Sequence, residues 1–204
     1  MIPARHAPWF QWLFDIYLKI AFRRSFHAIE VVGDVKDKGL GILVIANHIS
    51  WWDGFWILHL NQKIFKRKLF VMMLEDQLRK NSFLRKLGAF SIRKKSKTAG
   101  ESLTYAAEKL KDPCNMVLLF PQGEIHSHHA FPLQFEQGWG KRVLQPHNDF
   151  QVLMVANLLD YFSNPKPLLR QYIYSPEKTS GFICSELQEE YNRFYQRCIQ
   201  MQTR

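Results

Sequence analysis

Residues 40–60, LGILVIANHISWWDGFWILHL, decide the fold: an apolar run meets a polar cluster, and a second apolar run follows. With one formal charge in 21 residues, the segment resembles a membrane span. The polar residues of 47–53, however, fall in its middle, where a bilayer would penalise them most. Residues 40–46 are typical of a strand covered on both faces. We therefore predict a buried strand, then a half-buried helix that starts near Ser50 and ends near Leu60.

On both sides of this segment, strand-like runs alternate with helix-like runs. Further strands are predicted at 26–32, 68–74, 88–92, 116–120, 150–159 and 168–174. Further helices are predicted at 7–24, 76–87, 98–111 and 185–200. The alternation predicts an α/β fold with a central, mainly parallel mixed sheet flanked by helices. A chain of 204 residues suits one domain, residues 1–204, with a core over 25–204.

The N-terminal helix, residues 1–24 with its lead-in, is rich in aromatic side chains. Aromatic residues make up 14% of the chain, more than a core of this size needs, which indicates a binding surface or membrane interface. Asp15 and Lys19 interrupt the apolar run, so the segment lacks a signal-peptide pattern. Two interpretations stay open: a core helix, or an amphipathic helix lying on a bilayer, which Trp residues and basic ends favour.

The net charge of +10 is concentrated in one segment. Residues 61–97 contain twelve Lys and Arg against only Glu75 and Asp76. Such a patch attracts nucleic acid, anionic lipid, a phosphorylated substrate or an acidic carrier protein. The segment contains apolar runs and no DNA- or RNA-reading motif, so we expect no nucleic-acid partner. The three cysteines are widely spaced and form no disulfide framework, which favours a reducing compartment.

His48 and Asp53 form the first candidate site, directly after the buried strand. On a continuous helix, side chains five residues apart diverge by about 140°. The two can meet only if His48 lies in the loop and Asp53 in the first helical turn. The histidine would then be a general base and the carboxylate would orient it. Alternatively, Ser50-x-x-Asp53 is a helix capping box and His48 is an ordinary loop residue.

Two further segments follow predicted strands. In residues 120–127, FPQGEIHS, Gly123 can bring backbone N–H groups close to a ligand, and Gln122 or Glu124 could hold a hydroxyl. The alternative is a plain Pro-Gly turn. In residues 88–95, GAFSIRKK, a short strand leads into a basic cluster, whose alternative is a solvated sheet edge.

No nucleophile elbow, Walker A loop or dinucleotide fingerprint occurs, so a substrate hydroxyl would supply the nucleophile. A metal hydrolase is the other enzyme class, suggested by His126, His128, His129 and His147. Adjacent histidines in a polar loop rarely converge on one ion, and there is no H-E-x-x-H helix. We expect no metal site.

Together these segments resemble the lysophospholipid acyltransferase family, whose best-known members are the 1-acylglycerol-3-phosphate acyltransferases. The resemblance covers roughly residues 25–160 and includes four motifs in the family's order. The matching residues are His48 and Asp53 for N-H-x(4)-D; Gly88, Phe90, Ile92 and Arg93 for G-x-x-F-I-x-R; Phe120, Pro121, Gly123 and Ser127 for F-P-E-G-T-R-S; and Phe135-Glu136-Gln137-Gly138 for F-K-x-G.

The departures from the family pattern lie mostly in the third motif. Gln122 stands where the motif has Glu, Ile125-His126 replaces its Arg, and one extra residue precedes Ser127. Glu124 is the nearby carboxylate that could substitute. After the F-K-x-G element, the family normally has a V-P-V strand motif. It corresponds here to residues 152–155, without the proline. These differences bear on the acceptor's identity more than on the reaction.

The resemblance implies acyl transfer from acyl-CoA or an acyl carrier protein, as co-substrate, to a lipid hydroxyl, with no bound cofactor. It makes His48 the general base and Asp53 its partner. The substrate-binding residues would be Arg93, Lys94, Phe120, Pro121, Gln122, Gly123 and Glu124. The implied acceptor is a lysophospholipid such as 1-acylglycerol 3-phosphate; an aminolipid, a glycolipid or a hydroxylated pigment is the alternative. We expect a cytoplasmic protein docked on the anionic cytoplasmic face of the inner membrane.

Overall fold

A seven-stranded sheet organises the part of the chain that the computed structural model describes, residues 1–94, 96, 98–136, 138–145 and 149–202. The strands lie in the order β1-β7-β6-β2-β5-β3-β4. Their bounds are β1 Ala28–Val32, β2 Ile42–Ala46, β3 Lys68–Leu74, β4 Ala89–Ile92, β5 Asn115–Leu119, β6 Gln151–Asp160 and β7 Leu168–Tyr174. Neighbouring strands are parallel except β6 and β7, which pair antiparallel, so the predicted mainly parallel mixed sheet is confirmed.

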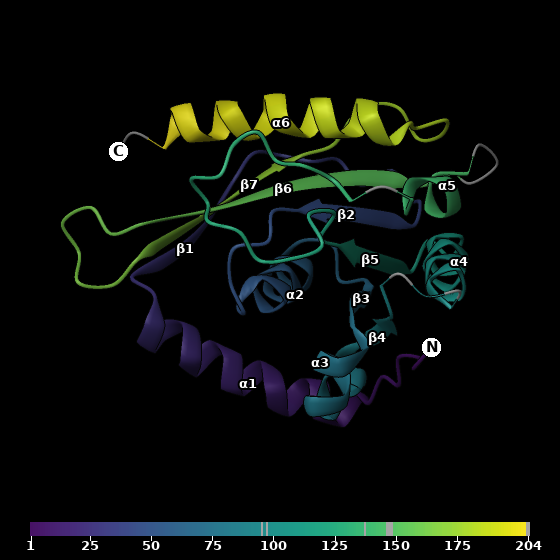
Figure 1. Cartoon of the computed structure of the whole chain (residues 1–204). Coiled ribbons are helices and arrows are strands. Elements are labelled where there is room, and N and C mark those ends of the chain that lie inside the picture. The colour runs from purple at the N-terminus through teal and green to yellow at the C-terminus, as the bar shows by residue number, and fades with distance from the viewer. Residues whose placement is uncertain (95, 97, 137, 146–148, 203–204) are drawn as a thin grey trace.

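Helices cover both faces of this sheet (Figure 1). One face packs against α1 (Pro8–Ser25) and α2 (Asp53–Lys63). The other face packs against α4 (Ala99–Leu110), the short α5 (Gly140–Val143) and α6 (Cys184–Met201). Every residue of β2 and β5 is buried, which explains why these strands read as unbroken apolar runs. The result is the single layered α/β domain that the sequence predicts.

The prediction of one continuous helix over residues 76–87 is wrong. The structure divides it into α3 (Glu75–Lys80) and a 3-10 helix, η1 (Ser82–Leu87). The break falls at Asn81, whose backbone leaves the helical region at φ −122° and ψ 54°. Asn and Ser compete with helical hydrogen bonding through their own side chains, and the two stand side by side at this break. The four-residue α5 was not predicted because it is too short to show a periodic pattern.

The helix α1 is apolar on two opposite sides. Leu18 and Phe22 are buried against the sheet layer. A second apolar stripe points away from the body and consists of Trp9, Trp12, Leu13, Ile16, Tyr17 and Ile20. Packing against the domain therefore accounts for only half of the apolar residues of α1. Among the described residues, no helix combines the length and the apolarity required to cross a bilayer.

A buried amide holds the end of β2 to the neighbouring strand β6. Asn47, the residue that follows β2, accepts the backbone N–H of Asn157 at 2.8 Å and donates to its carbonyl at 2.9 Å. The side chain thus continues the strand pairing by one step beyond the backbone. Gln171 on β7 donates to the side-chain oxygen of Asn157 at 3.0 Å and extends the network. This network fixes the backbone immediately before His48.

Replacing Asn47 with Ala should lower the free energy of unfolding by about 2–4 kcal/mol, because two buried backbone groups of Asn157 lose their partner. Urea unfolding followed by circular dichroism measures this. Asn164→Ala, in the turn between β6 and β7, is the control and should change stability by less than about 0.5 kcal/mol. Equal small effects of the two substitutions would contradict the role assigned to Asn47.

Candidate active site

The loops that follow β2 and β5 meet at the carboxyl edge of the sheet, where sites of open α/β folds gather. The His48 ring stacks on the Phe120 ring, with centroids 4.2 Å apart and planes 13° apart. The backbone N–H of His126 donates to the carbonyl oxygen of His48 at 2.9 Å. The first and third motifs, distant in sequence, are therefore in direct contact.

His48 and Asp53 meet as the spacing required. His48 lies in the loop and Asp53 is the first residue of α2, and His48 Nδ1 is 2.7 Å from Asp53 Oδ2. The same oxygen accepts the backbone N–H groups of Ile49 at 2.7 Å and Ser50 at 2.9 Å. Since those N–H groups can only donate, Oδ2 is set up as an acceptor, and Nδ1 carries the proton. The other ring nitrogen, Nε2, is then the free base.

The capping box predicted over Ser50 and Asp53 forms only in half. The Ser50 N–H donates to Asp53 as such a box requires, but Ser50 Oγ accepts the N–H of Trp52 at 3.1 Å and not that of Asp53. Helix α2 begins at Asp53, and its N-cap is Trp52, so Ser50 lies in the turn before the helix. Both hydrogen bonds hold that turn. Asp53 therefore organises the loop and contacts His48 with one oxygen.

Asp53 is fully buried, and burial raises the pKa of its carboxyl above the ordinary value. Hydrogen bonds from His48, Ser50 and Ile49 act in the opposite direction and favour the ionised form. Its second oxygen, Oδ1, is buried without a hydrogen-bond partner among the described residues. A carboxylate in this position gains most when His48 becomes an imidazolium, because an unpaired buried charge is costly.

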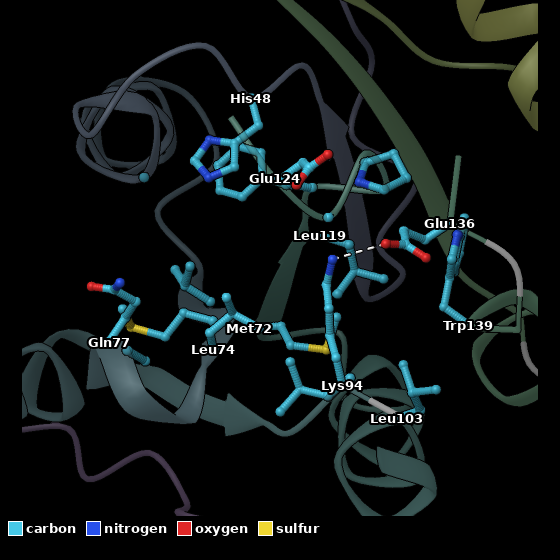
Figure 2. Close-up of a pocket in the computed structure, with 18 of the residues that line it drawn as sticks. His48, Met72, Leu74, Gln77, Lys94, Leu103, Leu119, Glu124, Glu136 and Trp139 are labelled. Carbon is cyan, nitrogen blue, oxygen red and sulfur yellow. Dashed lines mark hydrogen bonds and ion pairs between the residues drawn. The ribbon is translucent and has the colours of Figure 1, made fainter. Parts of the chain in front are cut away.

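His48 lines a pocket of about 870 Å³. Strand β3 contributes to it from both faces, since Val71 packs with the α2 layer and Met72 with the opposite layer. The apolar part of the pocket includes Leu58, Leu69, Val71, Met73, Leu84, Leu87 and Ala89. The charged part consists of Lys94, Glu124, Glu136 and Arg142. Figure 2 shows Lys94 reaching across the pocket toward Glu136, with His48 and Glu124 on the same pocket wall.

Most of the predicted site residues gather in this pocket. Lys94, Phe120, Pro121, Gly123 and Glu124 all line it together with His48. Three residues of the predicted segments lie outside the described residues: Lys95, Gln137 and His147.

Gln122 and Arg93 lie outside the pocket lining. The buried Gln122 side chain accepts the backbone N–H of His48 at 2.7 Å, so it contacts the loop that carries His48. Arg93 is 60% exposed and donates to Glu75 at 2.7 Å. Arg79 donates to the same carboxylate, and the hydrogen bonds from these two arginines hold the pKa of Glu75 below its ordinary value.

Gly123 is required by its surroundings. Its φ of +74° is in the left-handed region, which favours glycine. A Cβ at this position would come within 2.7 Å of both Lys94 Nζ and Glu136 Cγ. The neighbours of Gly123 form an ion pair, with Lys94 Nζ 2.8 Å from Glu136 Oε1.

Glu136, Trp139 and Arg142 also line the pocket. The sequence pattern predicts no site role for them. Glu136 stood out only as part of a motif-like element, and no pattern pointed to the other two.

Of the histidines considered for a metal, His126, His128 and His129 lie in the loop after β5. His126 Nε2 is 3.3 Å from Glu124 Oε1, and the rings of His128 and His129 are 4.0 Å apart. Over the described ranges, no three or more His, Cys, Asp or Glu side chains converge where they could hold a metal ion.

The fold and the site are those of an α/β protein in which the histidine of a histidine–carboxylate pair lines a largely apolar pocket. The sequence model of the family described as Acyltransferase matches residues 8–156, more than half of the chain. The protein therefore belongs to the acyltransferase family and is an acyltransferase enzyme. No curated protein and no solved structure matches the chain.

Asp53→Ala should release the proton of His48 from Nδ1. The substitution removes Oδ2, the acceptor of the Nδ1 proton, so the share of the Nε2-protonated tautomer should rise. Nitrogen-15 NMR of the imidazoles distinguishes the two tautomers. Asp37→Asn, which alters an ion pair with Arg67, is the control and should leave His48 unchanged. The same His48 tautomer in all three proteins would rule out the assigned proton position.

Proposed function

We propose that the enzyme transfers a fatty acyl group from an acyl thioester, acyl-CoA or an acyl carrier protein, to the hydroxyl of a lipid, with His48 as general base. The observation that carries this proposal is the His48–Asp53 pair, whose free nitrogen belongs to a ring that lines the pocket. Membership of the acyltransferase family supports acyl transfer as the reaction.

The chemistry follows from the position of the proton. His48 Nε2 takes the proton from the acceptor hydroxyl as its oxygen attacks the thioester carbonyl. Asp53 stabilises the imidazolium that forms. The tetrahedral intermediate then collapses, the carbon–sulfur bond breaks, and the imidazolium returns the proton to the thiolate. An ester and a free thiol leave, and no cofactor is consumed.

The pocket suits a substrate with a long hydrocarbon chain. Its volume of about 870 Å³ lies in the range of small-molecule sites, and its apolar part is made of aliphatic and Met side chains from α2, β3, η1 and β4. We assign the acyl chain to this apolar part. The resemblance to lysophospholipid acyltransferases supports a lysophospholipid as acceptor, with 1-acylglycerol 3-phosphate as the first expectation. An aminolipid, a glycolipid or a hydroxylated pigment is the alternative acceptor class.

We further propose that the protein docks on the anionic cytoplasmic face of the inner membrane. The outward apolar stripe of α1 supports this, because an aromatic helix face with basic ends is suited to the bilayer interface. Arg23 and Arg24 supply that basic end. Lys86 lies over the rings of Trp9 and Phe10, which joins the stripe to the basic segment. An acidic carrier protein is the other partner that this basic surface suits.

His48→Ala should reduce turnover of oleoyl-CoA with a lysophospholipid by about 10²–10⁴-fold, because the hydroxyl loses its proton acceptor. Thiol release measures the rate, and thermal unfolding checks the fold. His27→Ala, at an exposed position between α1 and β1, is the control and should keep full activity. Near-normal turnover in the His48 variant would reject the mechanism.

The double substitution Trp12→Ser and Ile16→Ser should weaken binding to phosphatidylglycerol vesicles by at least about tenfold, since it removes two apolar contacts of the stripe. Co-sedimentation measures binding, and phosphatidylcholine vesicles test the need for negative charge. Ile199→Ser on α6, which lies across the sheet from α1 (Figure 1), is the matched control. If both proteins bind equally well, α1 is not the docking surface.

A further inference from the structure

The charges that the described residues bring to the pocket lining are balanced. Among the described residues, two cations, Lys94 and Arg142, and two carboxylates, Glu124 and Glu136, line it. Lys94 and Glu136 are paired at 2.8 Å, and their side chains are 39% and 55% exposed. Both are thus accessible to a ligand. Glu124 is within 3.3 Å of His126, an imidazole rather than a permanent cation.

The basic excess of residues 61–97 contributes little to this balance. Of the basic residues of that segment that the structure describes, Lys94 alone lines the pocket. Arg67 pairs with Asp37, and Arg79 and Arg93 share Glu75. Arg93, the expected ligand of an acceptor phosphate, is thus committed to a carboxylate outside the pocket lining.

A phosphate monoester fits this surrounding poorly. It carries a charge of about −1.5 to −2 at pH 7 and needs a cationic excess. Here the two described cations share the pocket with two carboxylates, and like charges placed side by side lower affinity. A head group that carries one cation and one anion finds an opposite charge in the pocket for each of them. Its anion can replace Glu136 at Lys94, and its ammonium can replace Lys94 at Glu136.

We infer that the charged part of the pocket, formed by Lys94, Glu136, Glu124 and Arg142, binds the zwitterionic head group of the acyl acceptor. This inference rests on the proposed function and narrows its acceptor class to lipids that carry both an ammonium and an anionic group. The ion pair between Lys94 and Glu136 occupies the site when it is free. The glycine at 123 leaves the room that this pair needs.

Three acceptors with the same acyl chain and the same glycerol hydroxyl test the inference. They are 1-oleoyl-lysophosphatidylethanolamine, which is zwitterionic, 1-oleoylglycerol 3-phosphate, which is a monoester, and 1-oleoylglycerol, which is uncharged. With oleoyl-CoA as donor, kcat/KM should be at least about tenfold higher for the zwitterion than for the monoester. A preference for the monoester or for the uncharged acceptor overturns the inference and leaves the proposed function standing. Turnover of none of the three contradicts the inference together with the lysophospholipid acceptor, and leaves acyl transfer to the other acceptor classes.

Glu136→Gln isolates the role of the carboxylate. It should raise KM for the zwitterion about tenfold with little change in kcat, and shift the preference toward the monoester. Glu124→Gln should act in the same direction and provides a second variant if the first does not fold. Glu186→Gln on α6, which removes an exposed carboxylate near Lys178, is the control and should keep the preference. An unchanged ratio in both pocket variants refutes the charge-balance argument.

Discussion

One oxygen atom, Oδ2 of Asp53, holds the loop on which the site depends. It accepts three hydrogen bonds, from the His48 ring and from the backbone of Ile49 and Ser50. Burial makes the charge on this carboxyl costly and raises its pKa, and those donors offset part of the cost. The orientation of His48 and the entry into α2 are therefore set by the same contacts. In the sequence, holding the turn before α2 and pairing with His48 look like alternative explanations of Asp53. In the structure, the same oxygen atom does both.

The backbone around His48 is fixed from several directions. Asn47 ties the preceding residue to β6, Gln122 accepts the His48 N–H, and Phe120 stacks against its ring. These contacts come from β5, β6 and the loop between them, while the pocket extends toward β3 and β4. The order of strands, with β2 between β6 and β5, is what places His48 between a rigid core and an open pocket.

The basic residues that cluster in the sequence do not form one unpaired cationic patch once the chain is folded. In the sequence, residues 61–97 form one basic block, which suggests a single anion-binding patch. In the structure, Arg67, Arg79 and Arg93 are each paired with a carboxylate, and Asp37 comes from outside that segment. Counting charge along the chain could not reveal this, because ion pairs depend on which side chains meet in space.

The sequence by itself determined the fold class, nearly all of the elements, and the two residues at the centre of the site. It could do so because a buried parallel strand needs an unbroken apolar run, and because the spacing of His48 and Asp53 allows one geometry in which they meet. Only the tertiary structure decided the break at Asn81, the contact of Gln122 with His48, and the placement of Glu136 and Arg142 in the pocket lining. These features depend on contacts between segments far apart in the chain, which leave no periodic or spacing signal in the sequence.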